Sequence, residues 1–207
     1  GVNAMSHDGV GWIVDTTEER YVARYVVNAA GAWADEIAAL ASVPRLGLIP
    51  KRRTIIAFDP PSGVDISGWP FLKTVADDGF YMLPDAGRLL ASPMDAAPWP
   101  PCDVQPDDYE TALAAWRVEE ATMLKVERIA AKWAGLRSFV ADNVPTAGFS
   151  PAAPGFFWLA GQGGYGLQTS PAMAMAAEAL LFGLPWPALL AEHGIQPEHI
   201  RPERLSG

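Results

Sequence analysis

The clearest hydrophobic pattern in the chain is a short apolar run, then a cluster of glycines, then a second apolar segment. The run covers residues 156–160, which is typical of a buried β-strand. Four glycines follow within residues 161–166. Ser170 and Pro171 favour the start of a helix, as N-cap and first helical residue, and Gly183 favours its end. The pattern therefore predicts a strand, a glycine-rich loop, and a helix that begins at Pro171 and ends just before Gly183.

A second unit of the same kind precedes it. Residues 21–28 are predicted to form a strand whose end is continuously apolar, as in a buried parallel strand. The small residues 29–31 follow, and a helix is expected to begin near Ala32. Its apolar face is predicted to carry Trp33, Ile37, Leu40 and Ala41. Asn28, at the end of the strand, is expected to fill a structural role in the turn.

Between these two units, the polar and apolar alternation is typical of antiparallel strands around one helix. The expected strands and helix cover residues 52–58, 79–84, 88–92, 109–126 and 130–139. Lys51, Arg52 and Arg53 are interpreted as a solvated basic turn. The fold class is α/β (α+β): part of an α/β domain together with an antiparallel-sheet domain that contains a long helix.

The composition excludes several kinds of binding partner and site. The net charge of -9 disfavours nucleic acid and anionic membranes as partners. The single cysteine, Cys102, excludes an internal disulfide and favours a reducing, cytoplasmic location. No apolar run reaches the roughly 18 residues of a membrane span, and the three histidines do not cluster with acids or with Cys102, so no metal site is expected.

The glycine spacing by itself leaves two interpretations open. Gly161, Gly163 and Gly166 match the spacing of a dinucleotide-binding loop, which lets backbone amides approach a phosphate. That motif also requires a following strand and an acidic residue about twenty positions on, and neither is found here. A tight turn without a ligand remains the alternative.

Four ordered segments resemble the FAD-dependent amine oxidoreductases of the D-amino-acid oxidase family, which includes glycine oxidase, sarcosine oxidase and the D-amino-acid dehydrogenases. Residues 26–41 resemble the middle signature of that family, and residues 79–89 its substrate-domain hairpin. Residues 133–142 and 160–172 resemble its Gly-Leu-Arg-Pro segment and its C-terminal flavin-contacting loop and helix. The resemblance spans almost the whole chain.

The resemblance implies a cofactor and a set of site residues. FAD would be bound without a covalent link, because Gly135 or Leu136 stands where sarcosine oxidases carry the flavin-linked cysteine. Two groups of residues would contact FAD: Ala29, Ala30, Gly31 and Trp33 along the nucleotide, and Gly161, Gly163, Gly164, Tyr165, Gly166 and Leu167 along the isoalloxazine and ribityl portion.

Two further residues match catalytic positions of the family. Arg137 matches the arginine that holds the substrate carboxylate, and Tyr81 a substrate-site tyrosine. A surface ion pair for Arg137 and an ordinary strand aromatic for Tyr81 are the structural alternatives. The implied substrate is a small amino acid or amine that loses hydride from the carbon bearing nitrogen.

The family's opening strand, Gly-x-Gly-x-x-Gly turn and helix are missing from this sequence, so a chain cut from a longer enzyme is expected. Residues 1–44 and 146–207 would belong to the FAD-binding domain, and residues 45–145 to the substrate-binding domain. The alternative is a non-catalytic fragment, or a subunit that needs a partner carrying the nucleotide-binding half. An incomplete sheet edge also predicts self-association.

Overall fold

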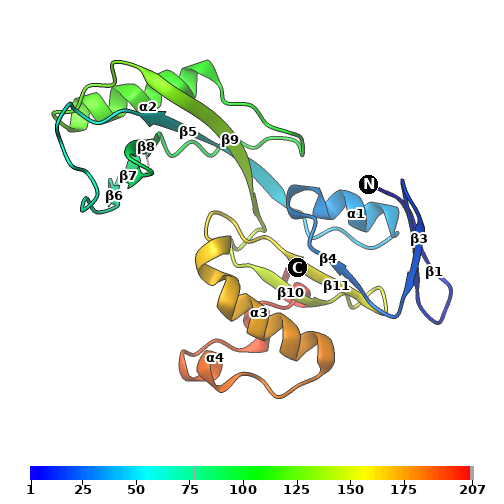
Figure 1. Ribbon diagram of the computed structural model, residues 1–207. Coiled ribbons are helices and arrows are strands. Elements are labelled where there is room, and N and C mark those ends of the chain that lie inside the picture. The colour runs from blue at the N-terminus through cyan, green and yellow to red at the C-terminus, as the bar shows by residue number, and fades with distance from the viewer. Residues whose placement is uncertain (77, 206–207) are drawn as a thin grey trace. The chain divides into compact units, whose positions relative to one another are not determined.

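The computed structural model describes residues 1–76 and 78–205, and the chain divides into two compact units (Figure 1). Unit 1 comprises residues 1–50 and 137–207, and unit 2 comprises residues 51–136. The roles expected for residues 1–44, 45–145 and 146–207 stay predictions. The mixture of helices, antiparallel strand pairs and a parallel strand pair confirms the predicted fold class.

The central sheet of unit 1 has the order β10-β11-β4. These strands are β4 (Val26–Asn28), β10 (Thr146–Phe149) and β11 (Phe156–Ala160). β11 runs antiparallel to β10 and parallel to β4, with Trp158 opposite Asn28, so the predicted parallel strand is confirmed.

The predicted strand over residues 21–28 is two strands in the structure, β3 (Arg20–Ala23) and β4. Its expected burial was also wrong, because Tyr25 and Val27 are exposed. Val27 lies at the sheet edge opposite Phe157, and the core around α3 (Gly166–Phe182) includes Phe157 but not Val27. β3 belongs to a separate antiparallel sheet with β1 (Val2–His7) and β2 (Trp12–Thr16).

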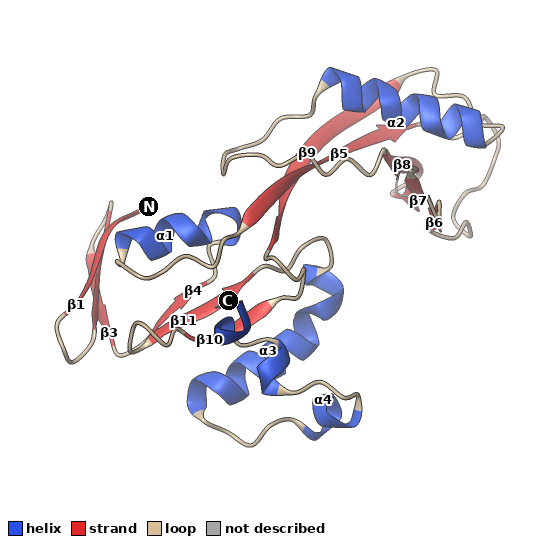
Figure 2. Ribbon diagram, turned by 180° about the vertical axis from the view of Figure 1, so that it is seen from behind, coloured by secondary structure: helices blue, strands red, loops and turns tan. Residues whose placement is uncertain are grey.

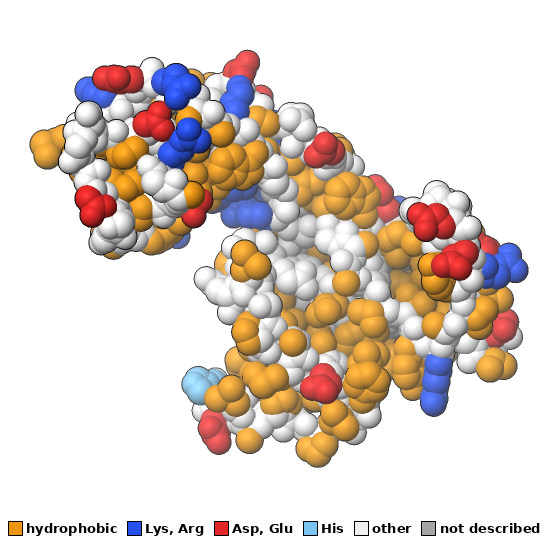
Figure 3. Space-filling view, viewed as in Figure 1, with side chains coloured by type: hydrophobic (Ala, Val, Ile, Leu, Met, Phe, Trp, Pro, Cys, Tyr) orange, Lys and Arg blue, Asp and Glu red, His pale blue; other side chains and the backbone are white. Residues whose placement is uncertain are grey.

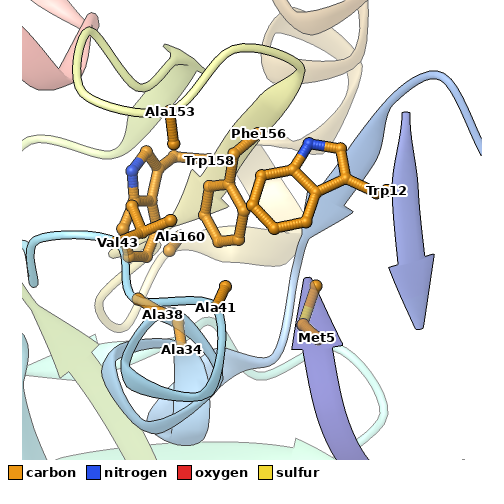
Figure 4. Close-up of a cluster of buried hydrophobic side chains, with 10 residues drawn as sticks. All are labelled: Met5, Trp12, Ala34, Ala38, Ala41, Val43, Ala153, Phe156, Trp158 and Ala160. Carbon is orange, nitrogen blue, oxygen red and sulfur yellow. The ribbon is translucent and has the colours of Figure 1, made fainter. Parts of the chain in front are cut away.

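β11 is apolar at every position because both of its faces are covered. Phe156 and Trp158 point into a core that includes small residues of α1 (Ala34–Leu40), as Figure 4 shows. Phe157 and Leu159 pack in a second core with α3. A strand covered on both faces has no polar side, which explains the continuous apolar run.

The predicted apolar face of the first helix is right only in part. Ala41 is buried and Ile37 packs against the core, as predicted, whereas Trp33 and Leu40 are exposed and Ala34 and Ala38 are buried instead. A 3₁₀ turn over Gly31–Trp33 precedes α1 and shifts the phase of the helix. The small alanine face also lets α1 lie close to the bulky rings of β11.

The structure also corrects the start of α3, which begins at Gly166 rather than Pro171. Pro171 lies inside the helix, where it has no N–H to donate to the carbonyl of Leu167. The Ser170 hydroxyl donates to that carbonyl at 2.8 Å instead, so the proline is tolerated. The end of α3 is as predicted, with Gly183 in the left-handed region at φ 64°.

The C-terminal part of unit 1 contains α4 (Ala188–Glu192) and two 3₁₀ turns, Pro197–His199 and Pro202–Leu205. Arg204 in the last turn fastens this tail to the segment between β9 (Ile129–Phe139) and β10. Its guanidinium donates to both carboxylate oxygens of Asp142, to the carbonyl of Val144 and to the Thr146 hydroxyl.

Unit 2 is built on the five-stranded sheet β6-β7-β8-β5-β9. Besides β9, its strands are β5 (Ile49–Phe58), β6 (Leu72–Lys73), β7 (Tyr81–Asp85) and β8 (Arg88–Ser92). The predicted hairpin of residues 79–92 is confirmed by the pairing of β7 with β8. α2 (Asp108–Ala121) lies along this sheet in Figures 1 and 2 and packs on its core through Ala114 and Val118.

α2 is shorter than the predicted helix over residues 109–126. Asp107 caps its start by accepting from the amide of Tyr109 at 2.8 Å. The helix ends at Ala121, since Thr122 is extended and its hydroxyl donates to the carbonyl of Val118 at 2.7 Å. Among the residues described, no helix has the length and hydropathy needed to cross a membrane.

Candidate functional site

Two loops rich in small residues meet at one edge of the unit 1 sheet. β4 and β11 are parallel neighbours, so their carboxyl ends lie on the same edge. Residues 29–31 follow β4, and residues 161–165 follow β11. In open α/β sheets, ligands bind in the crevice outside the carboxyl ends of the strands. The structure therefore brings together the two groups of residues predicted to contact FAD.

Asn28 holds the first loop in shape. Its side chain is buried, its Nδ2 donates to the carbonyl of Ala34 at 2.8 Å, and its Oδ1 accepts from the amide of Ala30 at 3.3 Å. These bonds tie the end of β4 to the start of α1, which confirms the structural role expected for Asn28. Ala29 and Ala30 line an apolar hollow of about 350 Å³ on the surface of unit 1.

The second loop is fastened to the end of β9. The amide of Gly163 donates to the carbonyl of Ser138 at 2.9 Å. Gly163 has φ 57°, and a Cβ there would lie 2.8 Å from Phe139 Cε1 and 2.9 Å from Tyr165 Cε2. Backbone conformation and packing thus require glycine at this position, independently of any ligand.

The start of α3 completes the second loop and leaves amides available to a ligand. The N–H groups of Gly166, Leu167 and Gln168 have no carbonyl partner within the helix, because they lie in its first turn. Leu167 is 95% exposed and Tyr165 is also exposed. The helix places its partial positive charge here, which favours an electron-rich group.

Arg137 lies beside the glycine-rich loop. A Cβ on Gly164 would be 3.2 Å from Nη1 of Arg137, and the guanidinium carbon lies 5.4 Å from the centroid of the Phe139 ring. Arg137 is half-buried at the end of β9. The structure thus brings this predicted catalytic residue together with the predicted flavin loop in unit 1.

Tyr81, the other predicted catalytic residue, belongs to unit 2. Its ring is stacked on Phe71 with a centroid distance of 5.7 Å, and the Arg53 guanidinium carbon lies 5.6 Å from its centroid. Because Tyr81 and Arg137 lie in different units, their joint action on one substrate stays a prediction.

The interpretation of residues 51–53 as a solvated basic turn is wrong. They lie in β5, where Arg52 points toward the α2 side and is only 6% exposed. The Arg52 guanidinium carbon lies 4.3 Å from the centroid of the Trp99 ring, and its Nε is 3.9 Å from the Asp95 carboxylate. The inward alternation of Arg52 with Thr54 and Ile56 was the sequence signal for this burial.

The pKa of the Glu110 carboxyl is raised, first by burial and then by the nearby negative charge of Asp95.

Across residues 1–76 and 78–205, no three His, Cys, Asp or Glu side chains gather closely enough to hold a metal ion.

A family model for FAD dependent oxidoreductases (DAO) matches residues 1–180 of the sequence. The chain belongs to this family. A curated relative from Xenopus laevis, "FAD-dependent oxidoreductase domain-containing protein 1", is 28% identical over 176 residues, covering 75% of this chain and 34% of the relative.

Solved structures of several enzymes share the fold of this chain. Glycine oxidase from Geobacillus kaustophilus is 25% identical with a TM-score of 0.73, covering 89% of this chain and 48% of the enzyme. L-amino acid deaminase from Proteus vulgaris is 14% identical with a TM-score of 0.78, covering 99% of this chain and 57% of the enzyme. This FAD dependent oxidoreductase chain therefore spans about half the length of the enzymes it matches.

The residues present fit part of a flavin site. The first-turn amides of α3, which have no partner within the helix, and the positive helix end suit the electron-rich edge of a flavin. Residues 29–31 and 161–167 are exposed or half-buried, except Gly161, so most of the predicted contacts are accessible.

Proposed function

We propose that this chain supplies the flavin-contacting loops and the substrate-binding sheet of an enzyme that oxidises the C–N bond of a small amino acid or amine. The observation that carries the proposal is the meeting of two loops at one sheet edge, with Arg137 packed against the second loop. Family membership supports FAD as the cofactor.

FAD would be held without a covalent bond by the two loops. Its contacts would be Ala29, Ala30, Gly31 and Trp33 in the first loop and Gly161, Gly163, Gly164, Tyr165, Gly166 and Leu167 in the second. When bound, FAD supplies the acceptor for hydride from the carbon that bears nitrogen. The amides of Gly166 and Leu167 would stabilise negative charge that develops at the adjacent ligand edge.

Arg137 would orient the substrate. A guanidinium stays charged at physiological pH and can bind a carboxylate with two parallel hydrogen bonds. The Tyr81 hydroxyl would add a hydrogen bond to the same substrate, fixing the carbon that loses hydride. Water then hydrolyses the imine product. No side-chain base is assigned, because in this chemistry the protein mainly orients the substrate and tunes the flavin.

The test is a substrate titration of FAD-loaded protein, followed through loss of the visible absorbance of oxidised flavin. Arg137→Ala should raise the half-saturating concentration of amino acids by about tenfold or more, because a charged hydrogen bond is lost. Arg20→Ala is the matched control, since Arg20 pairs with Asp15 on the surface of the same unit. An unchanged half-saturating concentration in Arg137→Ala would refute the assignment.

A non-catalytic role is the second candidate. The chain covers 48% of glycine oxidase, and β4 is a three-residue strand at the edge of its sheet. These features support a substrate-domain module, or a subunit completed by a partner that carries the nucleotide-binding half. Under this hypothesis the purified chain binds amino acids but produces no flavin reduction, even with excess FAD.

We also propose that the chain self-associates and that its location is reducing and cytoplasmic. Figure 3 shows hydrophobic side chains gathered over α3 and α4, and Phe182, Leu184 and Leu189 are exposed there. Together with the β4 edge, they support dimers or larger species. Light scattering of the purified chain tests this point, and a monomer across the micromolar range would contradict it.

A further inference from the structure

A small hollow within unit 1 lies outside the two loops of the candidate site. It has a volume of about 150 Å³, and its wall is formed by the segment after α1, the turn between β10 and β11, Trp158 and the C-terminal tail. The amide of Ser150 in that turn donates to the carbonyl of Phe156 at 2.8 Å, so the turn lies beside the first residue of β11. The glycine-rich loop follows the last residue of β11 instead, and neither residues 29–31 nor residues 161–167 line the hollow.

Two buried polar groups on this wall have no partner in the protein. Trp158 is only 1% exposed and Ser150 only 8% exposed. Across residues 1–76 and 78–205, neither the indole N–H of Trp158 nor the hydroxyl of Ser150 makes a hydrogen bond. Buried polar groups are ordinarily hydrogen-bonded. These two groups are therefore suited to bind a ligand in the hollow.

The indole of Trp158 differs in this respect from two other tryptophans of unit 1. Trp12 donates its indole N–H to the carbonyl of Pro154 at 2.9 Å, and Trp186 donates to a carbonyl of the tail at the same distance. Figure 4 shows the nitrogen of Trp158 on the side of its ring that faces away from Phe156. The donor of Trp158 thus points out of the core to which its ring belongs.

Arg45 adds a positive charge to the wall. Its side chain is exposed, and in the part of the chain that the structure describes it forms no ion pair. The described residues that line the hollow include no acid. An indole N–H and a guanidinium can only donate hydrogen bonds, and a hydroxyl can donate one. Three donors and one positive charge favour a carboxylate as the ligand.

The remaining wall is apolar and leaves little room. It is formed by Pro44, Leu46, Pro151, Ala152, Pro202 and Leu205. An apolar cavity of about 150 Å³ holds a molecule of the size of benzene. The ligand that fits this hollow is therefore a carboxylate with a short hydrocarbon chain.

Contacts within unit 1 hold this wall in place. Asp35 accepts hydrogen bonds from the amides of Leu46 at 2.9 Å and Leu48 at 2.8 Å, which fixes the segment that carries Arg45. The tail is held by Arg204, which donates to Asp142 at 2.7 Å. A largely pre-formed hollow with a few convergent polar groups is typical of a small-molecule site.

We propose that Trp158, Ser150 and Arg45 form a binding site for a short-chain monocarboxylate. The indole N–H and the hydroxyl would donate to the carboxylate oxygens, and Arg45 would supply the positive charge from the exposed side. The apolar wall would contact the hydrocarbon chain. This site requires neither FAD nor Arg137, so it goes beyond the proposed function.

The test is a titration of propionate into the isotope-labelled 207-residue chain, followed through the indole N–H resonance of Trp158 by nuclear magnetic resonance. Trp158→Phe keeps a ring but removes the N–H, so it assigns that resonance. We expect a saturable shift with a Kd on the order of 1 mM. The indole resonances of Trp12 and Trp186 should stay in place, because both donors already have partners.

Two substitutions test the polar contacts. Ser150→Ala should weaken propionate binding about tenfold, because a hydrogen bond to a charged group is lost. Arg45→Gln should weaken it by about fivefold or less, because the charge of an exposed arginine is screened by solvent. Ser6→Ala and Arg20→Gln replace exposed residues of the same unit and should leave the affinity unchanged. Wild-type affinity in both Ser150→Ala and Arg45→Gln would overturn the proposal.

The choice of probe tests the class of ligand. Propionamide has the same size as propionate but no charge, and an equal response to it would overturn the assignment of a carboxylate. A Trp158 shift with sulfate but not with propionate would also overturn it, because the hollow would then take an inorganic anion. So would the absence of any saturable shift.

A last variant separates this site from the proposed substrate site. Arg137→Gln should leave the response of Trp158 to propionate unchanged. If Arg137→Gln abolishes that response, propionate binds at the proposed substrate arginine and the separate site fails. If the response persists while Arg137→Ala leaves amino-acid saturation unchanged, the role of Arg137 fails and the monocarboxylate site stands.

Discussion

Replacing Arg204 with Gln should loosen the C-terminal tail from the segment that leads into β10. The guanidinium donates to Asp142 at 2.7 and 3.2 Å, and it also bonds the carbonyls of Val144, Ile200 and Arg201. Its side chain is only 13% exposed, whereas that of Asp142 is 40% exposed. The ion pair is therefore screened by solvent. Most of the stability lost in the variant comes from the missing hydrogen bonds to the carbonyls.

The expected magnitude follows from these contacts. A solvent-screened ion pair contributes about 0.2–1 kcal/mol, and each hydrogen bond from the mostly buried Arg204 side chain to a carbonyl about 1 kcal/mol after competition with water. Arg204→Gln should thus lower the free energy of unfolding by about 3 kcal/mol. For a chain of this size, that corresponds to a fall of roughly 6–12 °C in its melting temperature.

The effect should depend on pH in one direction. The hydrogen bond from Arg204 lowers the pKa of Asp142. The ion pair therefore contributes its full stability above the ordinary aspartate value of about 3.9 and loses it as pH falls through the lowered pKa. The difference between Arg204→Gln and wild type should narrow in acid, but not vanish, because the carbonyl bonds remain.

Circular dichroism melts at neutral and acidic pH measure both effects. Arg20→Gln is the control, because Arg20 and Asp15 form an exposed pair that should contribute no more than about 1 kcal/mol. If Arg204→Gln is no more destabilising than Arg20→Gln, the tail is not fastened by Arg204 and the reasoning fails.

Three other substitutions test the packing. Trp158→Ala removes a fully buried ring and should cost about 3–5 kcal/mol of unfolding free energy, measured by urea denaturation. Gly163→Ala should weaken FAD binding and lower the melting temperature, whereas Gly68→Ala, with open space around its Cβ, should change neither; equal effects would refute the packing argument. Arg52→Met leaves the buried Asp95 with one cation fewer and should cost about 3–5 kcal/mol in the same denaturation assay, and a neutral result would contradict the ion pair.

The sequence predicted the elements whose pattern is local. The strand over residues 156–160 and the end of α3 at Gly183 are as expected, because an apolar run and a left-handed glycine are properties of neighbouring residues. The start of α3 was misplaced because Ser170 and Pro171 match an N-cap pattern, whereas the Ser170 hydroxyl compensates for the proline inside the helix.

Which residues are buried depends on contacts between segments that are far apart in the sequence, and local patterns do not show these contacts. The face of α1 was misassigned in part because Trp33 and Leu40 were expected inside, yet Phe156 and Trp158 already fill that core, and the fully buried residues of this segment are alanines. Arg52 was expected in solvent because the cation, its ring partner Trp99 and its carboxylate partner Asp95 are far apart in sequence. The two loops of the candidate site lie at one sheet edge because β4 pairs with β11, and these two strands are far apart in the sequence.

A titration of FAD into the 207-residue chain, followed by tryptophan and flavin fluorescence, tests the central claim most directly. If the loops after β4 and β11 form a flavin site, binding should saturate, and Gly163→Ala should weaken it while Gly68→Ala does not. An unsaturable response with the wild-type chain would contradict the claim that these loops hold the cofactor themselves, and would favour a module that depends on a separate nucleotide-binding half.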